Sequence, residues 1–198
     1  MGLNLDYSDG HTPLDEDEKD GLLIKTITTR GELDEFEQLG VEKANVWLLT
    51  RRLDAKRILT EEFVKELHKR MFSDIWEWAG EFRKTDKNLG IDKFMIGIEL
   101  KKLLDDCRFW IEKKTFTEDE IAIRLSHRMV SIHPFANGNS RHSRLIADVL
   151  INKQFKKSYF SWGSRNLVKH GEAHKQYLKA LKEADKLNYK PLIEFSRQ

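Results

Sequence analysis

The residues best suited to chemistry stand together in the stretch His133-Pro-Phe-Ala-Asn-Gly-Asn-Ser-Arg141. Pro134 cannot donate a backbone hydrogen bond and disfavours a helical conformation at the residue before it. Asn137, Gly138 and Asn139 are turn formers, and helical apolar spacing resumes after them. The stretch therefore predicts a helix that ends at His133, a glycine-containing loop, and a second helix.

The start of the second helix is predicted to bind an anion. Backbone N–H groups there lack intrahelical partners, and the helix dipole is positive at that end. Arg141 and Arg144 are three residues apart, so both guanidinium groups could reach one phosphate chain. Ion pairs with acidic neighbours such as Asp148 would explain the arginines equally well. The groups that would form the anion cradle belong to Gly138, Asn139, Ser140 and Arg141.

His133 and Asn137 offer two further functions at this loop. The reference pKa of histidine lies near neutrality, so His133 could accept the proton of a hydroxyl that attacks phosphorus, although a lone histidine is usually structural. Asn137 offers a neutral oxygen, which binds Mg²⁺ more weakly than a carboxylate does. A zinc site built from His127, His133 and His142 is disfavoured, since the chain has neither His-Glu-x-x-His nor a cysteine pair.

The stretch from His133 to Arg141, continued to Arg144, resembles the Fic signature His-x-Phe-x-Asp/Glu-Gly-Asn-x-Arg-x-x-Arg. Within the Fic/Doc family the chain is most similar to the group called mobile mystery protein B. That similarity is carried by Ile27-Thr-Thr-Arg-Gly-Glu-Leu33, Trp76-Glu-Trp-Ala-Gly80 and Ile132-His-Pro-Phe. The resemblance implies a mainly α fold, a Fic-type helical bundle with a short β-hairpin flap.

The resemblance also implies an activity, that of a protein adenylyltransferase, which in this group could serve as a toxin. A Ser, Thr or Tyr hydroxyl of a target protein would attack the α-phosphate of Mg-ATP, leave AMP on the target and release pyrophosphate. His133 would be the general base, Arg141 and Arg144 would hold the β- and γ-phosphates, and residues 138–140 would form the anion hole. The unknown target would add a strand to the flap, at about Arg83 to Ile96.

One position departs from the family pattern. Asn137 stands where the family has the Asp or Glu that binds Mg²⁺. Two alternatives therefore stay open, a Doc-like protein kinase and an attenuated module that binds nucleotide or protein without transfer. Ser140 favours AMP transfer over phosphate transfer, since this position is often Gly in adenylylating members and Lys in the Doc branch.

A self-inhibitory contact is a further hypothesis. Many Fic proteins are restrained by a helix bearing Ser/Thr-x-x-x-Glu-Gly/Asn, whose glutamate pairs with the second motif arginine. The segment Thr28-Thr-Arg-Gly-Glu32 matches in part, with Leu33 at the last position, and would pair Glu32 with Arg144. A capping box of Thr29 and Glu32 explains the same residues equally well.

The elements around the motif are predicted from caps and apolar spacing. Residues 1–28 should form an extended arm, and residues 29–198 a single Fic-like helical domain. Trp76 and Trp78 are interpreted as core anchors in preference to a stacking platform, and Cys107 as a buried thiol. Helices are expected over 30–51, from 60 to about 73, from 100 to about 114, from 117 to 133, after Gly138, over 168–187 and from 191 to the end.

Composition adds little about partners. Lys and Arg total 35 against 33 Asp and Glu, a net charge of +2, so no overall field calls for nucleic acid or an anionic membrane. The N-terminus lacks a secretory pattern, and no segment approaches the roughly 20 apolar residues that span a bilayer. These observations predict a cytoplasmic protein, and the group resemblance suggests a small helix-turn-helix antitoxin as its partner.

Overall fold

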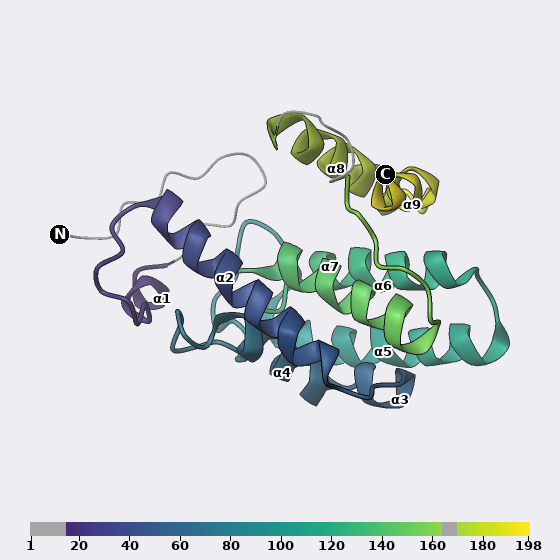
Figure 1. Cartoon of the computed structure of the whole chain (residues 1–198), viewed down its shortest axis with the longest axis horizontal. Coiled ribbons are helices and arrows are strands. Elements are labelled where there is room, and N and C mark those ends of the chain that lie inside the picture. Colours follow the sequence, from purple (N-terminus) through teal and green to yellow (C-terminus); the bar gives the residue numbers. More distant parts are fainter. Residues whose placement is uncertain (1–14, 164–169) are drawn as a thin grey trace.

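The computed structural model describes residues 15–163 and 170–198, and the described part is mainly helical (Figure 1). Helices α4, α7, α6 and α5 pack in that order as successive neighbours, and α2 lies against α4. Helices α8 and α9 form a pair that rests on α6 through α9. The bounds are α1 Glu16–Asp20, α2 Arg30–Leu49, α3 Ala55–Ile58, α4 Glu61–Phe72, η1 Lys93–Met95, α5 Ile96–Lys113, α6 Glu118–Ile132, α7 Asn139–Val149, the π-helix η2 Leu150–Gln154, α8 His170–Asp185 and α9 Lys190–Arg197.

Threonine caps set the starts of three long helices. Thr29, Thr60 and Thr117 each accept a hydrogen bond from the backbone N–H three residues later, which satisfies a donor that the helix itself leaves unpaired. The helices predicted at 30–51 and 60–73 are confirmed with bounds that differ by at most two residues. None of the helices in the described part is long and apolar enough to cross a bilayer.

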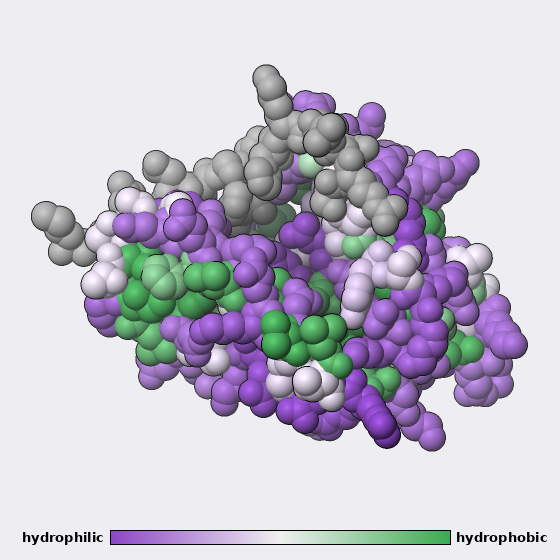
Figure 2. Space-filling view, in the orientation of Figure 1, coloured by the Kyte–Doolittle hydropathy of each residue, from purple (hydrophilic) through white to green (hydrophobic). Residues whose placement is uncertain are grey.

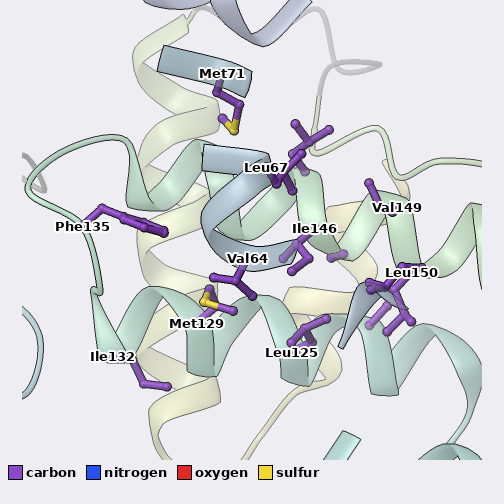
Figure 3. Packing of buried hydrophobic residues seen from close by; sticks show 14 of the residues in the cluster. Val64, Leu67, Met71, Leu125, Met129, Ile132, Phe135, Ile146, Val149 and Leu150 are labelled. Atoms are coloured by element: carbon purple, nitrogen blue, oxygen red, sulfur yellow. The ribbon is translucent and has the colours of Figure 1, made fainter. Parts of the chain in front are cut away.

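The core joins α4, α6 and α7 beneath the motif. Figure 3 shows Val64, Leu67 and Met71 of α4 facing the apolar side chains of α6 and α7, with Phe135 pointing from the loop into the same core. Trp76 is buried and stacks on Trp78 with the ring centroids 4.8 Å apart, which confirms the core interpretation. Cys107 is also buried, and burial raises the pKa of its thiol to about 12.

Helix α2 carries apolar residues on both sides. Its inner face consists of Leu33, Glu37, Gly40, Ala44 and Leu48, all buried. The outer face exposes Phe36, Leu39, Val46 and Leu49, and Figure 2 shows hydrophobic patches on the side of the molecule that α2 crosses. Phe36 is therefore exposed although it is apolar, whereas the charged Glu37 is buried on the inner face.

The N-terminal arm predicted over residues 1–28 lies partly outside the described residues. The described part, residues 15–28, is not extended: it contains α1, and it buries Leu22 and Ile27. Leu22 forms an antiparallel bridge with Trp76. Apolar side chains within the acidic segment therefore attach it to the domain.

The predicted β-hairpin over residues 82–96 is not confirmed. All of these residues are described; they form an irregular loop that ends in η1 and the start of α5. Arg83 explains the loop, because its buried guanidinium donates to the carbonyl oxygens of Thr85, at 2.7 Å, and of Ile91. Two carbonyl groups of this segment are thus satisfied by a side chain and not by a partner strand.

Candidate active site

His133 ends α6 at the position that the sequence predicts. Its φ is +55°, in the left-handed region, and its N–H donates to the carbonyl of Met129 at 3.1 Å. Nδ1 lies 3.3 Å from the Val130 carbonyl oxygen. A carbonyl can only accept, so this contact places the proton on Nδ1 and the lone pair on Nε2.

The imidazole of His133 is held neutral. Only 7% of the residue is exposed. Burial, together with the positive charges of Arg83 and Lys87, lowers the pKa of His133 to about 4, although the Val130 carbonyl acts in the opposite direction. A neutral imidazole is the form that can accept a proton from a hydroxyl.

The loop 82–92 lies directly on this histidine. Arg83 Nε donates to the His133 carbonyl oxygen at 2.7 Å, and the Arg83 N–H donates to the Pro134 carbonyl at 2.9 Å. A side chain on Gly90 would start 2.6 Å from Cβ of His133, so only glycine allows this approach. The loop predicted as a flap therefore borders the predicted base, although it is not a hairpin.

Phe135 and Asn139 fix the shape of the motif loop. The Asn139 side chain accepts from the Phe135 N–H at 2.9 Å and donates to the Phe135 carbonyl at 2.7 Å. The Phe135 ring is buried and stacks on His68 with centroids 3.7 Å apart. The side chain of Asn139, predicted to belong to the anion cradle, thus holds the loop, while its backbone N–H belongs to the first turn of α7.

His68 supports the loop from α4. Its Nδ1 accepts from the Gly80 N–H at 3.0 Å, so Nε2 carries the proton and donates to the Asn137 carbonyl at 3.1 Å. Burial holds the pKa of His68 well below its usual range. The sequence analysis missed this residue, which joins α4, the turn at Gly80 and the motif.

Gly138 begins α7 with φ +76° and no side-chain cap. A side chain here would start 2.4 Å from a ring carbon of Phe72. The helix therefore starts at a glycine where α2, α4 and α6 have a threonine, and no side chain caps its first-turn donors. Uncapped donors at a positive helix end suit a phosphate.

Arg141 and Asn137 both contact Glu37, from the inner face of α2. Glu37 is fully buried; its Oε1 accepts from Asn137 Nδ2 at 2.8 Å and from Trp76 Nε1 at 2.9 Å, and its Oε2 pairs with Arg141 Nη2. The acidic neighbour of the motif arginine is thus Glu37. Asp148, considered in the sequence analysis, instead accepts from Trp162 and Phe160.

Arg144 makes different contacts from those of Arg141. Its Nε donates to the Ser140 carbonyl at 3.2 Å, and its guanidinium lies 5.6 Å from the centre of the Tyr177 ring. The two arginines therefore do not converge in this structure, since Arg141 faces Glu37. Both side chains are long enough to turn toward one phosphate chain when the ion pair of Arg141 opens.

Glu32 does not contact Arg144. Its Oε2 accepts from the N–H groups of Thr28 and Thr29 at 2.9 and 3.0 Å, which lowers the pKa of this carboxyl group. The capping reading is the one seen in the structure. The carboxylate that α2 brings to a motif arginine is Glu37, five residues further on.

Glu37 could have been found from the sequence. Positions 33, 37, 40, 44 and 48 follow the spacing of a buried helical stripe, and the residue at 37 is charged. Lys, Glu, Arg and Asp are almost never fully buried unless they are paired. A glutamate inside an apolar stripe therefore indicates a buried cationic partner.

His127 and His142, the other two histidines of the disfavoured zinc site, serve the fold. His127 joins Asp185, at 2.9 Å, to the hydroxyl of Tyr189, at 3.3 Å, and His142 donates to the Val64 carbonyl at 3.0 Å. Among the described residues, no group of three or more His, Cys, Asp or Glu side chains could hold a metal ion. A metal here would have to be bound by fewer protein ligands together with phosphate oxygens.

Known proteins resemble this chain in sequence and in architecture. A family model described as the Fic/DOC family matches residues 58–151. Two curated relatives, each called "Protein adenylyltransferase Fic", are 25% identical: the protein of Aedes aegypti over 66% of this chain and 29% of its own length, and that of Drosophila grimshawi over 82% and 33%. The chain therefore spans about a third of the length of these relatives.

Solved structures show the same fold at low identity. Fic-1 of C. elegans matches with a TM-score of 0.66 at 20% identity, over 83% of this chain and 48% of that one. The N-terminal Fic domain of Bep8 from Bartonella sp. 1-1C has a TM-score of 0.66 at 18% identity, with coverages of 88% and 89%. BepC of Bartonella tribocorum, solved with bound AMPPNP, has a TM-score of 0.63 at 17% identity, over 92% and 97%.

Proposed function

Residues 58–151 of this chain belong to the Fic/DOC family, and on that premise we propose that the protein transfers AMP from Mg-ATP to a Ser, Thr or Tyr hydroxyl of a target protein. The names of the two curated relatives support adenylyl transfer. The nucleotide analogue in BepC supports a nucleotide as the ligand of this fold. The observation that carries the proposal is a neutral His133 beside the uncapped, glycine-started helix α7 with its two arginines.

The reaction assigns a task to each of these groups. The target hydroxyl oxygen attacks the α-phosphorus while Nε2 of His133 takes its proton. The bond between the α-phosphorus and the oxygen that bridges to the β-phosphate breaks, and pyrophosphate leaves with the electron pair. Arg141 and Arg144 hold the leaving phosphates, and the first-turn N–H groups of α7 stabilise the charge on the oxygens.

The target docks beside His133, on the loop 83–96. This segment exposes three apolar side chains, Leu89, Phe94 and Met95, and Phe94 is 81% exposed. The irregular backbone gives this loop no preformed strand edge. Apolar contacts with these side chains therefore add to any backbone pairing in holding the target.

Magnesium fits this site when Glu37 is included among the donors. Asn137 alone offers a neutral amide oxygen, whereas Mg²⁺ prefers anionic oxygen and is commonly bound by one or two carboxylates plus substrate phosphates. Glu37 places a carboxylate one hydrogen bond from Asn137. The bound cation would neutralise phosphate charge that develops during transfer.

Radioactive ATP tests the proposal against its two alternatives. The purified protein is incubated with Mg²⁺ and bacterial lysate, with ATP labelled either at the α- or at the γ-phosphate, and proteins are separated on gels. Adenylyl transfer gives protein label from α-labelled ATP only. Label from γ-labelled ATP only would indicate a Doc-like kinase, and nucleotide binding without either label would indicate an attenuated binding module.

The pH dependence of transfer provides a second prediction. Because burial lowers the pKa of His133 to about 4, the imidazole stays unprotonated down to about pH 5. We expect kcat/KM to be level from about pH 6 to 8 and to fall only as the pH approaches 4, since kcat/KM reports the groups of the free enzyme. Circular dichroism at each pH separates this from acid unfolding. An acid limb centred near 6.5 would contradict a buried base.

A further inference from the structure

Glu37 is unusual because it is a charged residue that is fully buried beside the motif. It is the one carboxylate among the fully buried residues of the described chain, and it is also the one carboxylate that these residues bring into hydrogen-bond or ion-pair contact with the motif from His133 to Arg144. A buried charge is strongly unfavourable unless it is paired and hydrogen-bonded. Glu37 meets that condition through Arg141, Asn137 and Trp76.

Asn137 and Glu37 are complementary in charge. The amide of Asn137 donates to Glu37 Oε1 at 2.8 Å. An aspartate at 137 would instead direct a second carboxylate at that of Glu37. Two carboxylates at such a short distance do not both ionise without a cation between them. The neutral residue in the motif therefore matches a negative charge that α2 already brings to the same point.

On the premise of the proposed function, we infer that Glu37 is the carboxylate that binds the divalent cation of the Mg-nucleotide, in the role that Asn137 cannot fill. Phosphate competes with Glu37 Oε2 for Arg141, whose side chain is 22% exposed. When Arg141 turns to phosphate, Oε2 is released to the cation, and each charge again has a partner. Trp76 and Asn137 continue to donate to Oε1 and so keep the carboxylate oriented.

The cation dependence of nucleotide binding tests this assignment without any turnover. The dissociation constant of AMPPNP is measured by calorimetry with Mn²⁺ and with EDTA, and the ratio of the two is the coupling between cation and nucleotide. The proteins compared are wild type, Glu37→Gln, Asn137→Asp, the exchange variant Glu37→Gln/Asn137→Asp, and Glu32→Gln as a control on the same helix. Glu32 caps α2 and has no contact with the motif among its hydrogen bonds.

We expect Mn²⁺ to tighten AMPPNP binding at least tenfold in wild type and in Glu32→Gln. In Glu37→Gln the coupling should fall below twofold, while binding in EDTA is unchanged or tighter because Arg141 is no longer neutralised. The exchange variant should recover most of the coupling, since it returns one carboxylate to the same place. Equal tightening of Glu37→Gln with and without Mn²⁺ would overturn the inference and make Glu37 only a competitor of phosphate.

Two further outcomes are informative. Wild type that fails to bind AMPPNP under either condition would remove the proposed function and the inference with it, whereas binding whose coupling is independent of Glu37 removes the inference alone. Thermal unfolding of Asn137→Asp supplies a test that does not require Glu37→Gln to fold. Mn²⁺ without nucleotide should raise its Tm by several degrees more than that of wild type, and an equal shift would show that the two carboxylates do not share a cation.

Discussion

Replacing His133 with Asn or Ala is expected to lower the rate of AMP transfer about 10²–10⁴-fold, the usual contribution of a general base. Asn tolerates the left-handed conformation that His133 adopts at φ +55°, so the end of α6 should keep its backbone. The affinity for AMPPNP should stay within about threefold, because Arg141 and the start of α7 are unchanged. The measurement is single-turnover transfer of α-labelled AMP at saturating ATP, together with calorimetry.

The matched control is His174→Asn, an exposed histidine on α8. Its rate should equal that of wild type. If His133→Asn kept more than about a tenth of the wild-type rate, His133 would not be the base. If it lost nucleotide binding in parallel, the residue would act by shaping the loop, through the backbone contacts of Arg83 with His133 and Pro134.

The helix ends that depend on residues close together in the chain could be predicted from the sequence. Three helix starts could be predicted because a threonine hydroxyl accepts a hydrogen bond from a backbone N–H only three residues away. The threonines are Thr29, Thr60 and Thr117. Pro134 predicts the end of α6 for a steric reason that involves two residues. The motif loop was therefore placed correctly, between two helices and with a glycine at positive φ.

The parts that the sequence did not predict depend on partners distant in the chain. Arg83 belongs to the segment that was predicted as a hairpin flap. Its side chain is nevertheless buried and donates to the carbonyl oxygen of His133, 50 residues away in the chain. Lys87 pairs with Asp15 at 2.8 Å and with Glu18, which fastens the described part of the predicted arm to the loop. The spacing along α2 marks Glu37 as a buried carboxylate, but its partner Arg141 comes from another helix. No periodicity within one segment reveals which residues form such a pair.

Gly40→Ala is expected to destabilise the protein by about 3 kcal/mol or more, although alanine favours helices over glycine by about 1 kcal/mol. A Cβ at this position would lie 2.0 Å from the Met71 carbonyl oxygen, which belongs to the backbone of α4 and cannot rotate away. Helices α2 and α4 would have to separate. In thermal unfolding, a loss of this size in a domain of this length lowers Tm by roughly 6–12 °C.

Gly31→Ala is the matched control, because it lies in the first turn of the same helix and nothing surrounds its Cβ position within 4 Å. It should leave stability unchanged or raise it by up to about 1 kcal/mol. The two substitutions have the same chemistry, so opposite signs isolate the close helix crossing as the cause. Unchanged Tm in Gly40→Ala would contradict that crossing.

Gly40→Ala also tests how α2 takes part in the site. Gly40 and Glu37 lie on the same inner face, one turn apart, so a helix pushed away from α4 withdraws its carboxylate from Asn137 and Arg141. If Glu37 binds the cation, Gly40→Ala at a temperature where it is still folded should weaken the coupling between Mn²⁺ and AMPPNP as Glu37→Gln does. Retained coupling in a destabilised protein would instead show that α2 contributes to stability but not to the cation site.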